Sequence, residues 1–244
     1  MTKFIRQDKR TAAQLREVKI TPHFVSTADG SCLIEMGGTR VICTASIETK
    51  VPKWLAESEK GWVTAEYSML PASTGSRKRR PIGKPDSRSV EIQRLIGRAL
   101  RSVVNLHKIP GIQITVDCDV LEADGGTRTA SITGGQVALA LAIQKAQQLD
   151  LAMPKALTGH IAAISVGIVD DTCLLDLPYV EDSIAEVDMN VAMTSKGEFI
   201  EIQGTSEGKP FTQDQLFKML NLAKRGINKL IKLQKQAIST SEDK

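Results

Sequence analysis

The stretch of this sequence best suited to bind an anion is a glycine turn at residues 124–131, DGGTRTAS. It joins a predicted strand to a predicted helix, whose start leaves backbone N–H groups unpaired and partly positive. Glycines let an anion approach the backbone, and hydroxyls and a guanidinium follow at Thr127, Thr129, Ser131 and Arg128. The pattern predicts a phosphate site, although a plain glycine turn with a helix cap explains the residue types equally well. It is not a Walker A loop, because the pattern G-x-x-x-x-G-K-S/T is absent.

Arg88 is a second candidate for the same phosphate. It lies at the start of a predicted helix, Ser89–Val104, in which Arg94, Arg98 and Arg101 recur at helical spacing, away from the apolar face. A phosphate held by arginines from two helix starts would gain roughly 1.5–3 kcal/mol from each charge-assisted hydrogen bond. Taken alone, Arg88 is better explained as a solvated arginine near a helix cap.

An acidic face is the third candidate. Glu186, Asp188 and Asn190 alternate with apolar residues along a predicted strand, so they share one face, and Asp182 comes just before it. Oxygen ligands of this kind suit Mg²⁺ or Mn²⁺, and Mg²⁺ typically takes only one or two protein carboxylates. A solvent-facing hairpin surface is an equally good explanation of the pattern.

A basic loop is the fourth candidate. Residues 71–85 read PASTGSRKRRPIGKP and contain four adjacent cations, Arg77, Lys78, Arg79 and Arg80. Such a run can follow a nucleic-acid backbone, or it can be solvated and idle. Tyr67 precedes the loop, but no aromatic residue is interleaved with the charges, so base stacking has weak support here.

The composition fits an ordinary globular protein. The 244 residues carry a net charge of +4, and 41% of them are hydrophobic, which is enough for a sizeable core. No segment has the signature of a secretory signal or a membrane span. The cysteines form no CxxC pair, which disfavours structural zinc and indicates a reducing cytoplasm. Only three histidines occur, none with a convincing partner, so a Ser/His/Asp triad has no support.

Strand-like and helix-like segments alternate along the chain, which predicts mixed β-sheets packed with helices, an α/β (α+β) fold. The predicted strands are residues 31–36 and 39–47, which form a hairpin, then 62–69, 112–121, 160–169, 173–177, and a second hairpin of 185–193 and 199–204. The predicted helices are residues 89–104, 128–149 and 212–238. Asp86 or Ser87 is expected to cap the first of these helices.

Five long blocks closely resemble the ribonuclease PH family. They are GWVTAEYSMLP, EIQRLIGRALR, VDCDVLEADGGTRTASITGG, YVEDSIAEVDMNVAMT and EIQGTSEGKPFT, in the family's order. The resemblance covers most of the chain and implies a ribosomal protein S5 domain 2-like fold in a single domain, residues 1–244. We expect residues 1–10 and 239–244 to be flexible ends.

The resemblance also implies an activity and roles for named residues. The enzyme would use inorganic phosphate to remove nucleotides from the 3′ end of transfer RNA precursors, releasing nucleoside 5′-diphosphates, and would also run in reverse. Phosphate would be bound by Arg88, Gly126, Thr127 and Arg128, with Arg128 also catalytic. Asp182 and Asp188 would be catalytic and hold a divalent cation, Mg²⁺. RNA would be guided by Arg77, Arg79 and Arg80, and the chain would assemble as a homo-hexamer, a trimer of dimers.

Two places depart from the family pattern. Ser87-Arg88-Ser89 stands where the family has Gly-Arg-Thr, and residues 6–10, RQDKR, stand where it has Arg-Pro-Asp-Gly-Arg. Two rival functions stay open: a non-catalytic ring subunit that only binds RNA, and a metal-dependent hydrolase. The first typically lacks the phosphate arginines or the acids, and the second leaves Arg88 and Arg128 unexplained.

Overall fold

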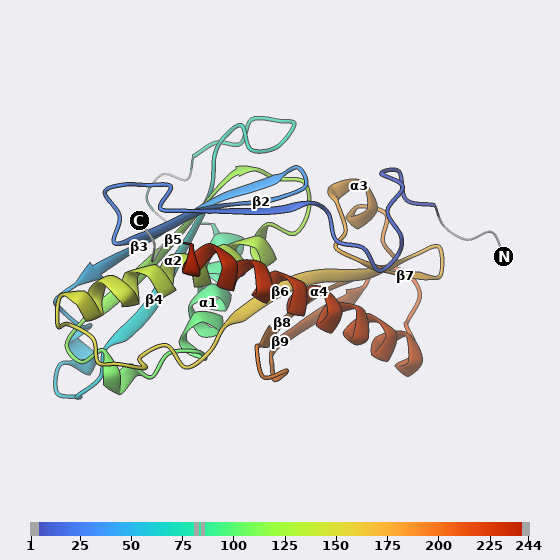
Figure 1. Ribbon diagram of the computed structural model, residues 1–244. Coiled ribbons are helices and arrows are strands. Elements are labelled where there is room, and N and C mark those ends of the chain that lie inside the picture. The colour runs from blue at the N-terminus through green and yellow to red at the C-terminus, as the bar shows by residue number, and fades with distance from the viewer. Residues whose placement is uncertain (1–4, 81–82, 84–85, 241–244) are drawn as a thin grey trace.

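The computed structural model describes residues 5–80, 83 and 86–240, and it is built from two β-sheets with helices between and around them (Figure 1). One sheet has five strands in the order β1-β2-β3-β5-β4, and the other has four in the order β7-β6-β8-β9. The strands are β1 Val18–Pro22, β2 Gly30–Met36, β3 Thr39–Glu48, β4 Trp62–Met69, β5 Gln113–Glu122, β6 Ile161–Val169, β7 Thr172–Leu175, β8 Val187–Thr194 and β9 Phe199–Ser206. The helices are η1 Lys53–Leu55, α1 Ser87–Arg101, η2 Leu106–Lys108, α2 Thr127–Gln148, α3 Tyr179–Asp182 and α4 Gln213–Ser239. The predicted mixed fold is confirmed.

Helix α2 lies between the two sheets and forms the centre of the core. It contacts β2, β3 and β5 on one side and β6 on the other, and its residues from Thr129 to Ile143 are all buried. Its alanines and glycines let both sheets approach closely. A Cβ atom on Gly134 would lie 2.7 Å from the Ile34 side chain and 2.8 Å from the sulfur of Cys43. The start of α2 is therefore held between the sheets.

Helix α1 covers β4 and begins at the edge of the five-stranded sheet. Asp86 caps it by accepting hydrogen bonds from the backbone N–H and the hydroxyl of Ser89, so the first of the two predicted caps is the correct one. The basic loop precedes this helix and projects from the top of the molecule in Figure 1. Its last residues, Pro81, Ile82, Lys84 and Pro85, lie outside the described part of the chain.

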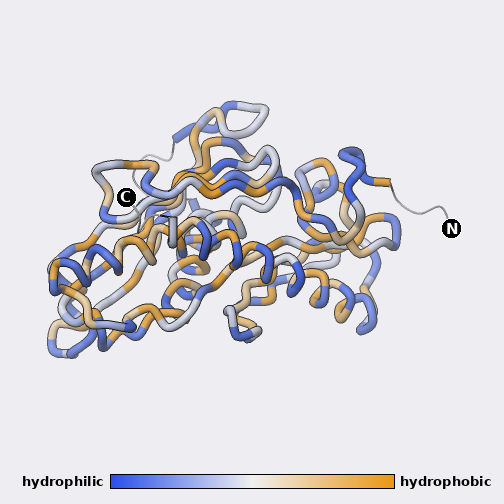
Figure 2. The backbone as a smooth tube through the Cα atoms, in the orientation of Figure 1, coloured by the Kyte–Doolittle hydropathy of each residue, from blue (hydrophilic) through white to orange (hydrophobic). Residues whose placement is uncertain are grey.

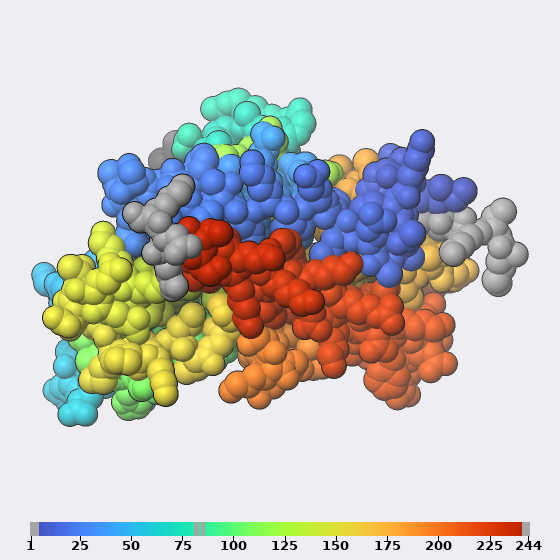
Figure 3. Space-filling view, viewed as in Figure 1, coloured from blue at the N-terminus to red at the C-terminus, as the bar shows by residue number. Residues whose placement is uncertain are grey.

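Helix α4 packs on the four-stranded sheet and reaches β1 of the other sheet. Its tube alternates between hydrophilic and hydrophobic colours in Figure 2, as an amphipathic surface helix does. Thr212 and Gln215 form a capping box at its start. In Figure 3 the red surface of α4 runs between the blue first sheet and the orange second half of the chain.

One hydrophobic core joins both sheets, because the buried residues of β2, β3 and β5 are continuous through α2 with those of β6, β8 and α4. This shared core supports the proposal that the chain is a single domain. Residues 1–4 and 241–244 of the predicted flexible ends lie outside the described residues. Within the described part of the chain, no helix is both long and apolar enough to cross a membrane.

We expect Gly134→Ala to destabilise the protein by about 1–3 kcal/mol, because the added methyl group would meet fully buried side chains of β2 and β3. Urea unfolding measures this change. Gly208→Ala is the control, since a Cβ atom there meets nothing within 4 Å. Equal stability of the two variants would contradict the close packing of α2 on the sheet.

Candidate active site

The glycine turn does end at an open helix start, as predicted. Gly126 is the N-cap residue of α2, and no side chain of the described residues caps it. The first bond of the helix runs from the N–H of Ala130 to the carbonyl of Gly126, so the N–H groups of Thr127 and Arg128 remain available for an anion. The Tyr67 hydroxyl, on buried β4, lies 2.9 Å from the Thr127 hydroxyl and fixes that side chain.

The two glycines of the turn are needed for a reason that the sequence did not reveal. Gly125 and Gly126 both adopt positive φ angles, of 73° and 70°. A Cβ atom on Gly125 would lie 2.5 Å from the carbonyl oxygen of Leu177 and 2.9 Å from the N–H nitrogen of Tyr179. Gly125 therefore lets the turn touch the backbone that leads into α3, which carries Asp182.

Two of the three predicted hydroxyls are buried and already used in hydrogen bonds to backbone carbonyls. Thr129 and Ser131 are fully buried and donate to the carbonyls of Gly126 and Thr127 in their own helix. These hydrogen bonds satisfy hydroxyl groups that are buried between the two sheets. Only Thr127 keeps its hydroxyl at the mouth of the turn.

Arg128 is held by neighbours from two other elements. Its Nη1 donates to Oε1 of Gln203 on β9 over 2.6 Å, and Gln203 in turn donates to Glu91 on α1 over 3.0 Å. Glu91 also lies 3.7 Å from the same guanidinium nitrogen. Gln203 and Glu91 fix the direction of the Arg128 side chain and connect it to α1, the helix that carries Arg88. The sequence alone gave no indication of this role for either residue.

The two predicted acids come together next to the arginines. Burial raises the pKa of Asp182, and the charges of Arg128 and Arg88 act in the opposite direction. Burial, followed by the neighbouring Asp182 carboxylate, raises the pKa of Asp188 to about 6. One oxygen of Asp188 is buried without a hydrogen-bond partner. Such a pair of half-buried acids beside two arginines is typical of a catalytic site.

A cavity of about 640 Å³ joins several of these parts, although Arg128 and Asp188 are not among the residues that line it. The residues that line it include Arg88, Gly125, Gly126, Thr127, Tyr179 and Asp182, together with Lys78 of the basic loop. Arg77, Arg79 and Arg80 are exposed on the same loop and do not line this cavity. Of the four adjacent cations in the basic loop, Lys78 is the one that lines the cavity. The sequence alone did not distinguish it from its three neighbours.

A buried ion pair behind the turn connects it to α3. The guanidinium of Arg16 is 2.7 Å from the carboxylate of Asp176, a residue with no exposed surface and a φ of 56°. Arg16 also donates to the carbonyl oxygens of Asp124 and Gly125. These carbonyls are turned toward Arg16, so the pair fixes the peptide groups of the turn relative to the segment before α3.

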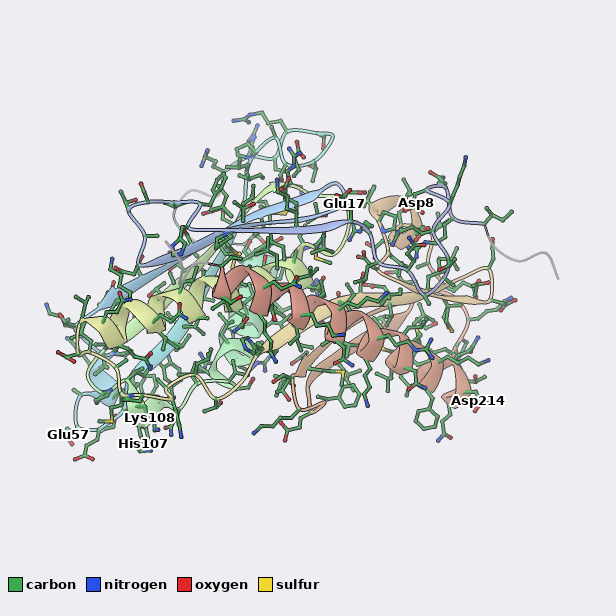
Figure 4. The ribbon with its side chains drawn as sticks, viewed as in Figure 1. Asp8, Glu17, Glu57, His107, Lys108 and Asp214 are labelled. Atoms are coloured by element: carbon green, nitrogen blue, oxygen red, sulfur yellow. The ribbon has the colours of Figure 1, made fainter. Side chains whose placement is uncertain are left out.

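Arg6 forms a second buried anchor on the other side of α3. It makes two hydrogen bonds to Glu181, of 2.9 and 2.6 Å, and donates to the carbonyls of Leu175 and Asp176. Glu181 directly precedes Asp182. The N-terminal segment, in which Figure 4 labels Asp8 and Glu17 close to α3, therefore braces one of the predicted catalytic acids.

Comparison with known proteins shows the family. Residues 14–143 match the family model described as 3′ exoribonuclease family, domain 1, and residues 159–226 match domain 2 of the same family. The chain is 53% identical over 234 residues to Ribonuclease PH of Neisseria meningitidis, covering 95% of this chain and 97% of that one. It is 52% identical over 239 residues to Ribonuclease PH of Mesorhizobium japonicum, covering 96% and 100%.

Solved structures with lower identity share the fold. Rrp46 of rice superposes with a TM-score of 0.74 at 18% identity, covering 97% of this chain and 99% of that one. A chain of the Archaeoglobus fulgidus exosome with RNA bound to the active site gives 0.76 at 22% identity, covering 93% and 91%. The likeness confirms the predicted fold.

The chain belongs to the 3′ exoribonuclease family. Its similarity to Ribonuclease PH over nearly the whole length confirms the predicted activity, phosphorolytic shortening of RNA from the 3′ end in the processing of transfer RNA, with inorganic phosphate as co-substrate.

We expect Arg16→Lys to raise the KM for phosphate about tenfold or more, because lysine keeps the charge next to Asp176 but loses the planar fork that also reaches two carbonyls of the turn. Steady-state kinetics at varied phosphate measure the change. Arg10→Lys is the matched control, since Arg10 also bonds to Asp176 but makes no contact with the turn. Equal KM values for the two variants would contradict the positioning role of Arg16.

Proposed function

We propose that inorganic phosphate binds at the start of α2, held by Arg88, Arg128 and the backbone of Gly126 and Thr127, and attacks the last phosphodiester of an RNA. The observation that supports this most directly is the open helix start flanked by two arginines and facing two acids of raised pKa. Helix starts and guanidinium groups both favour phosphate oxygens.

In this reaction a phosphate oxygen forms a bond to the terminal phosphorus, and the bond from that phosphorus to the 3′ oxygen of the preceding nucleotide breaks. The products are a nucleoside 5′-diphosphate and an RNA one nucleotide shorter, whose 3′ oxygen takes up a proton. The two arginines offset the charge on the attacking phosphate and the reacting phosphodiester. Most of the rate enhancement would come from positioning and charge stabilisation, since phosphate brings its own nucleophile.

Asp182 and Asp188 fit a divalent cation such as Mg²⁺. The unpartnered, buried oxygen of Asp188 and the mutual repulsion of the two carboxylates are what a bound cation would relieve. The charge of Glu207 also raises the pKa of both acids, but the described residues contain no group of three or more His, Cys, Asp or Glu side chains that could hold a metal, so the ligands we propose are these two carboxylates. That is the usual number for Mg²⁺. When bound there, the cation would stabilise negative charge on the leaving 3′ oxygen.

The RNA would approach along the basic loop. Arg77, Arg79 and Arg80 are exposed there, and Lys78 reaches the cavity wall, so the loop can contact successive phosphates of a strand whose 3′ end lies in the cavity. The substrates we propose are transfer RNA precursors with 3′ extensions. Added nucleoside diphosphates would support the reverse reaction.

We also propose that the chain assembles as a homo-hexamer, a trimer of dimers, in the cytoplasm. Solved structures of the same fold come from exosome assemblies, which supports an oligomer. The four cysteines are free thiols, and three of them are buried, which suits a reducing compartment.

The phosphate requirement tests the proposed reaction. With a 3′-extended transfer RNA, we expect shortening only when phosphate is present, and nucleoside diphosphates as the released product. Arg128→Ala should raise the phosphate concentration needed for half-maximal rate about 10- to 100-fold while RNA binding is mostly kept, since charge-assisted hydrogen bonds are lost. Release of monophosphates without phosphate would show a metal-dependent hydrolase instead.

Asp188→Asn should stabilise the protein while it abolishes most activity. The folded-state pKa of Asp188, about 6, lies above its value of about 4 in the unfolded chain, so stability is lost as the pH rises from about 4 to about 6, and the full cost is present above about pH 6. Below about pH 4 both states hold the proton and the cost disappears. We therefore expect a gain of about 1–3 kcal/mol in the free energy of unfolding near pH 8 and a smaller gain near pH 5.

Thermal unfolding with and without Mg²⁺ completes this test. Mg²⁺ should stabilise the parent protein and have little effect on Asp188→Asn. A variant that is less stable than the parent at both pH values, or that keeps the full Mg²⁺ effect, would contradict the assignment of Asp188.

A further inference from the structure

A groove between α1 and β4 lies outside the active site and is lined by cations and an aromatic ring. Its volume is about 340 Å³, and its lining includes Trp62, Gln93, Arg94, Arg98 and Arg101. The three arginines are the stripe that runs along α1 at helical spacing. Arg88 lies in the first turn of this helix, in the active site, and Arg101 lies thirteen residues further on, about 20 Å along the helix axis at 1.5 Å per residue.

The positive charge in this groove is not balanced. Arg94 and Arg101 make no ion pair with any described residue, and Arg98 makes one long contact, of 3.8 Å, to Glu201. Burial, followed by the charge of Arg98, lowers the pKa of Arg101. A half-buried arginine beside like charges and no carboxylate is a place where a ligand anion would be stabilised.

Trp62 lines the groove, and Trp54 packs against it from η1 and extends the aromatic edge. The guanidinium carbon of Arg101 lies 4.4 Å from the centre of the Trp62 ring, and Arg101 also donates to the carbonyl of Val63 over 2.7 Å. Trp54 on η1 packs edge-on against Trp62, with ring centres 4.9 Å apart, yet 67% of Trp54 is exposed. In Figure 4 the loop after η1 carries the labelled Glu57, at the end of the molecule far from Asp8.

Resting on the proposed function, we infer that this groove binds the RNA strand upstream of the 3′ end being cut, with Arg94, Arg98 and Arg101 on its phosphates and Trp54 against a base. Arginines that follow a backbone together with an exposed ring that can stack on any base are the two parts of a sequence-tolerant single-strand site. The proposal explains why the cations continue along α1 beyond the residues that hold phosphate.

The intrinsic fluorescence of the protein reports directly on this groove, because Trp54 and Trp62 are the only tryptophans in the chain. A long single-stranded oligoribonucleotide, titrated in phosphate-free buffer so that no shortening occurs, should quench the emission saturably. A trinucleotide, which fills only the active site, should not. Binding of the long RNA, measured separately by fluorescence anisotropy, without any change in tryptophan emission would overturn the proposal.

Variants of the exposed groove residues give an independent test. Arg94→Gln combined with Arg98→Gln should raise the KM for the long RNA about tenfold and lower the slope of log affinity against log salt by about 0.7 for each arginine. Trp54→Ala should weaken binding of the long RNA about fivefold or more. The KM for phosphate and the turnover of the trinucleotide should not change. Arg225→Gln combined with Lys229→Gln, two exposed cations on α4, is the charge-matched control.

The outcomes separate this proposal from the one it rests on. Equal effects of the Arg94 and Arg98 changes on long and short RNA would overturn the proposed RNA site in the groove. An effect no larger than that of the control with Arg225→Gln and Lys229→Gln would also overturn it. So would a change in oligomeric state by sedimentation, because the surface would then be an interface between copies of the chain. Failure of the parent protein to shorten the trinucleotide with phosphate would instead refute the proposed reaction, whatever the fluorescence shows.

Discussion

The buried ion pair between Arg16 and Asp176 is the interaction on which the geometry of the site depends. It joins the carbonyls of the glycine turn, in the first half of the chain, to the segment that leads into α3 in the second half. A buried pair of this kind adds little net stability, because desolvation offsets the attraction, but removal of one partner is costly. Its role here is therefore best understood as positional. It turns two carbonyls away from the site and leaves the N–H groups on the opposite side.

The charged side chains of the site need neighbours that fix their positions. Asp182 and Asp188 repel one another in a half-buried place, and the arginines that would offset them, Arg88 and Arg128, belong to two different helices. Without neighbours that fix them, these charged side chains would rotate into solvent. Gln203 and Glu91 prevent this for Arg128, and Arg6 with Glu181 does so for the helix of Asp182. The folded chain thus holds like charges close together at a cost in stability. Bound phosphate and a bound cation would offset these charges.

The sequence predicted the parts of this arrangement that are local. The glycine turn, the helix that follows it and the alternating face of β8 were predicted from local sequence pattern, and the family resemblance linked them. Strand β1 was missed because it is a short edge strand without clean alternation, and α3 because four residues give no period. Arg16 and Asp176 lie 160 positions apart, so no pattern in the sequence could pair them. The inward hydroxyls of Thr129 and Ser131 were misread because residue type does not reveal which side of a helix start is buried.

The central claim is that phosphate binds at the start of α2, between the arginines of two helices. A crystal structure of the protein soaked with phosphate in the absence of RNA tests this most directly. We predict a phosphate within hydrogen-bond distance of the backbone N–H groups at Gly126 and Thr127, with the guanidinium groups of Arg88 and Arg128 on its other oxygens. Phosphate bound elsewhere, with this helix start occupied only by water, would contradict the account.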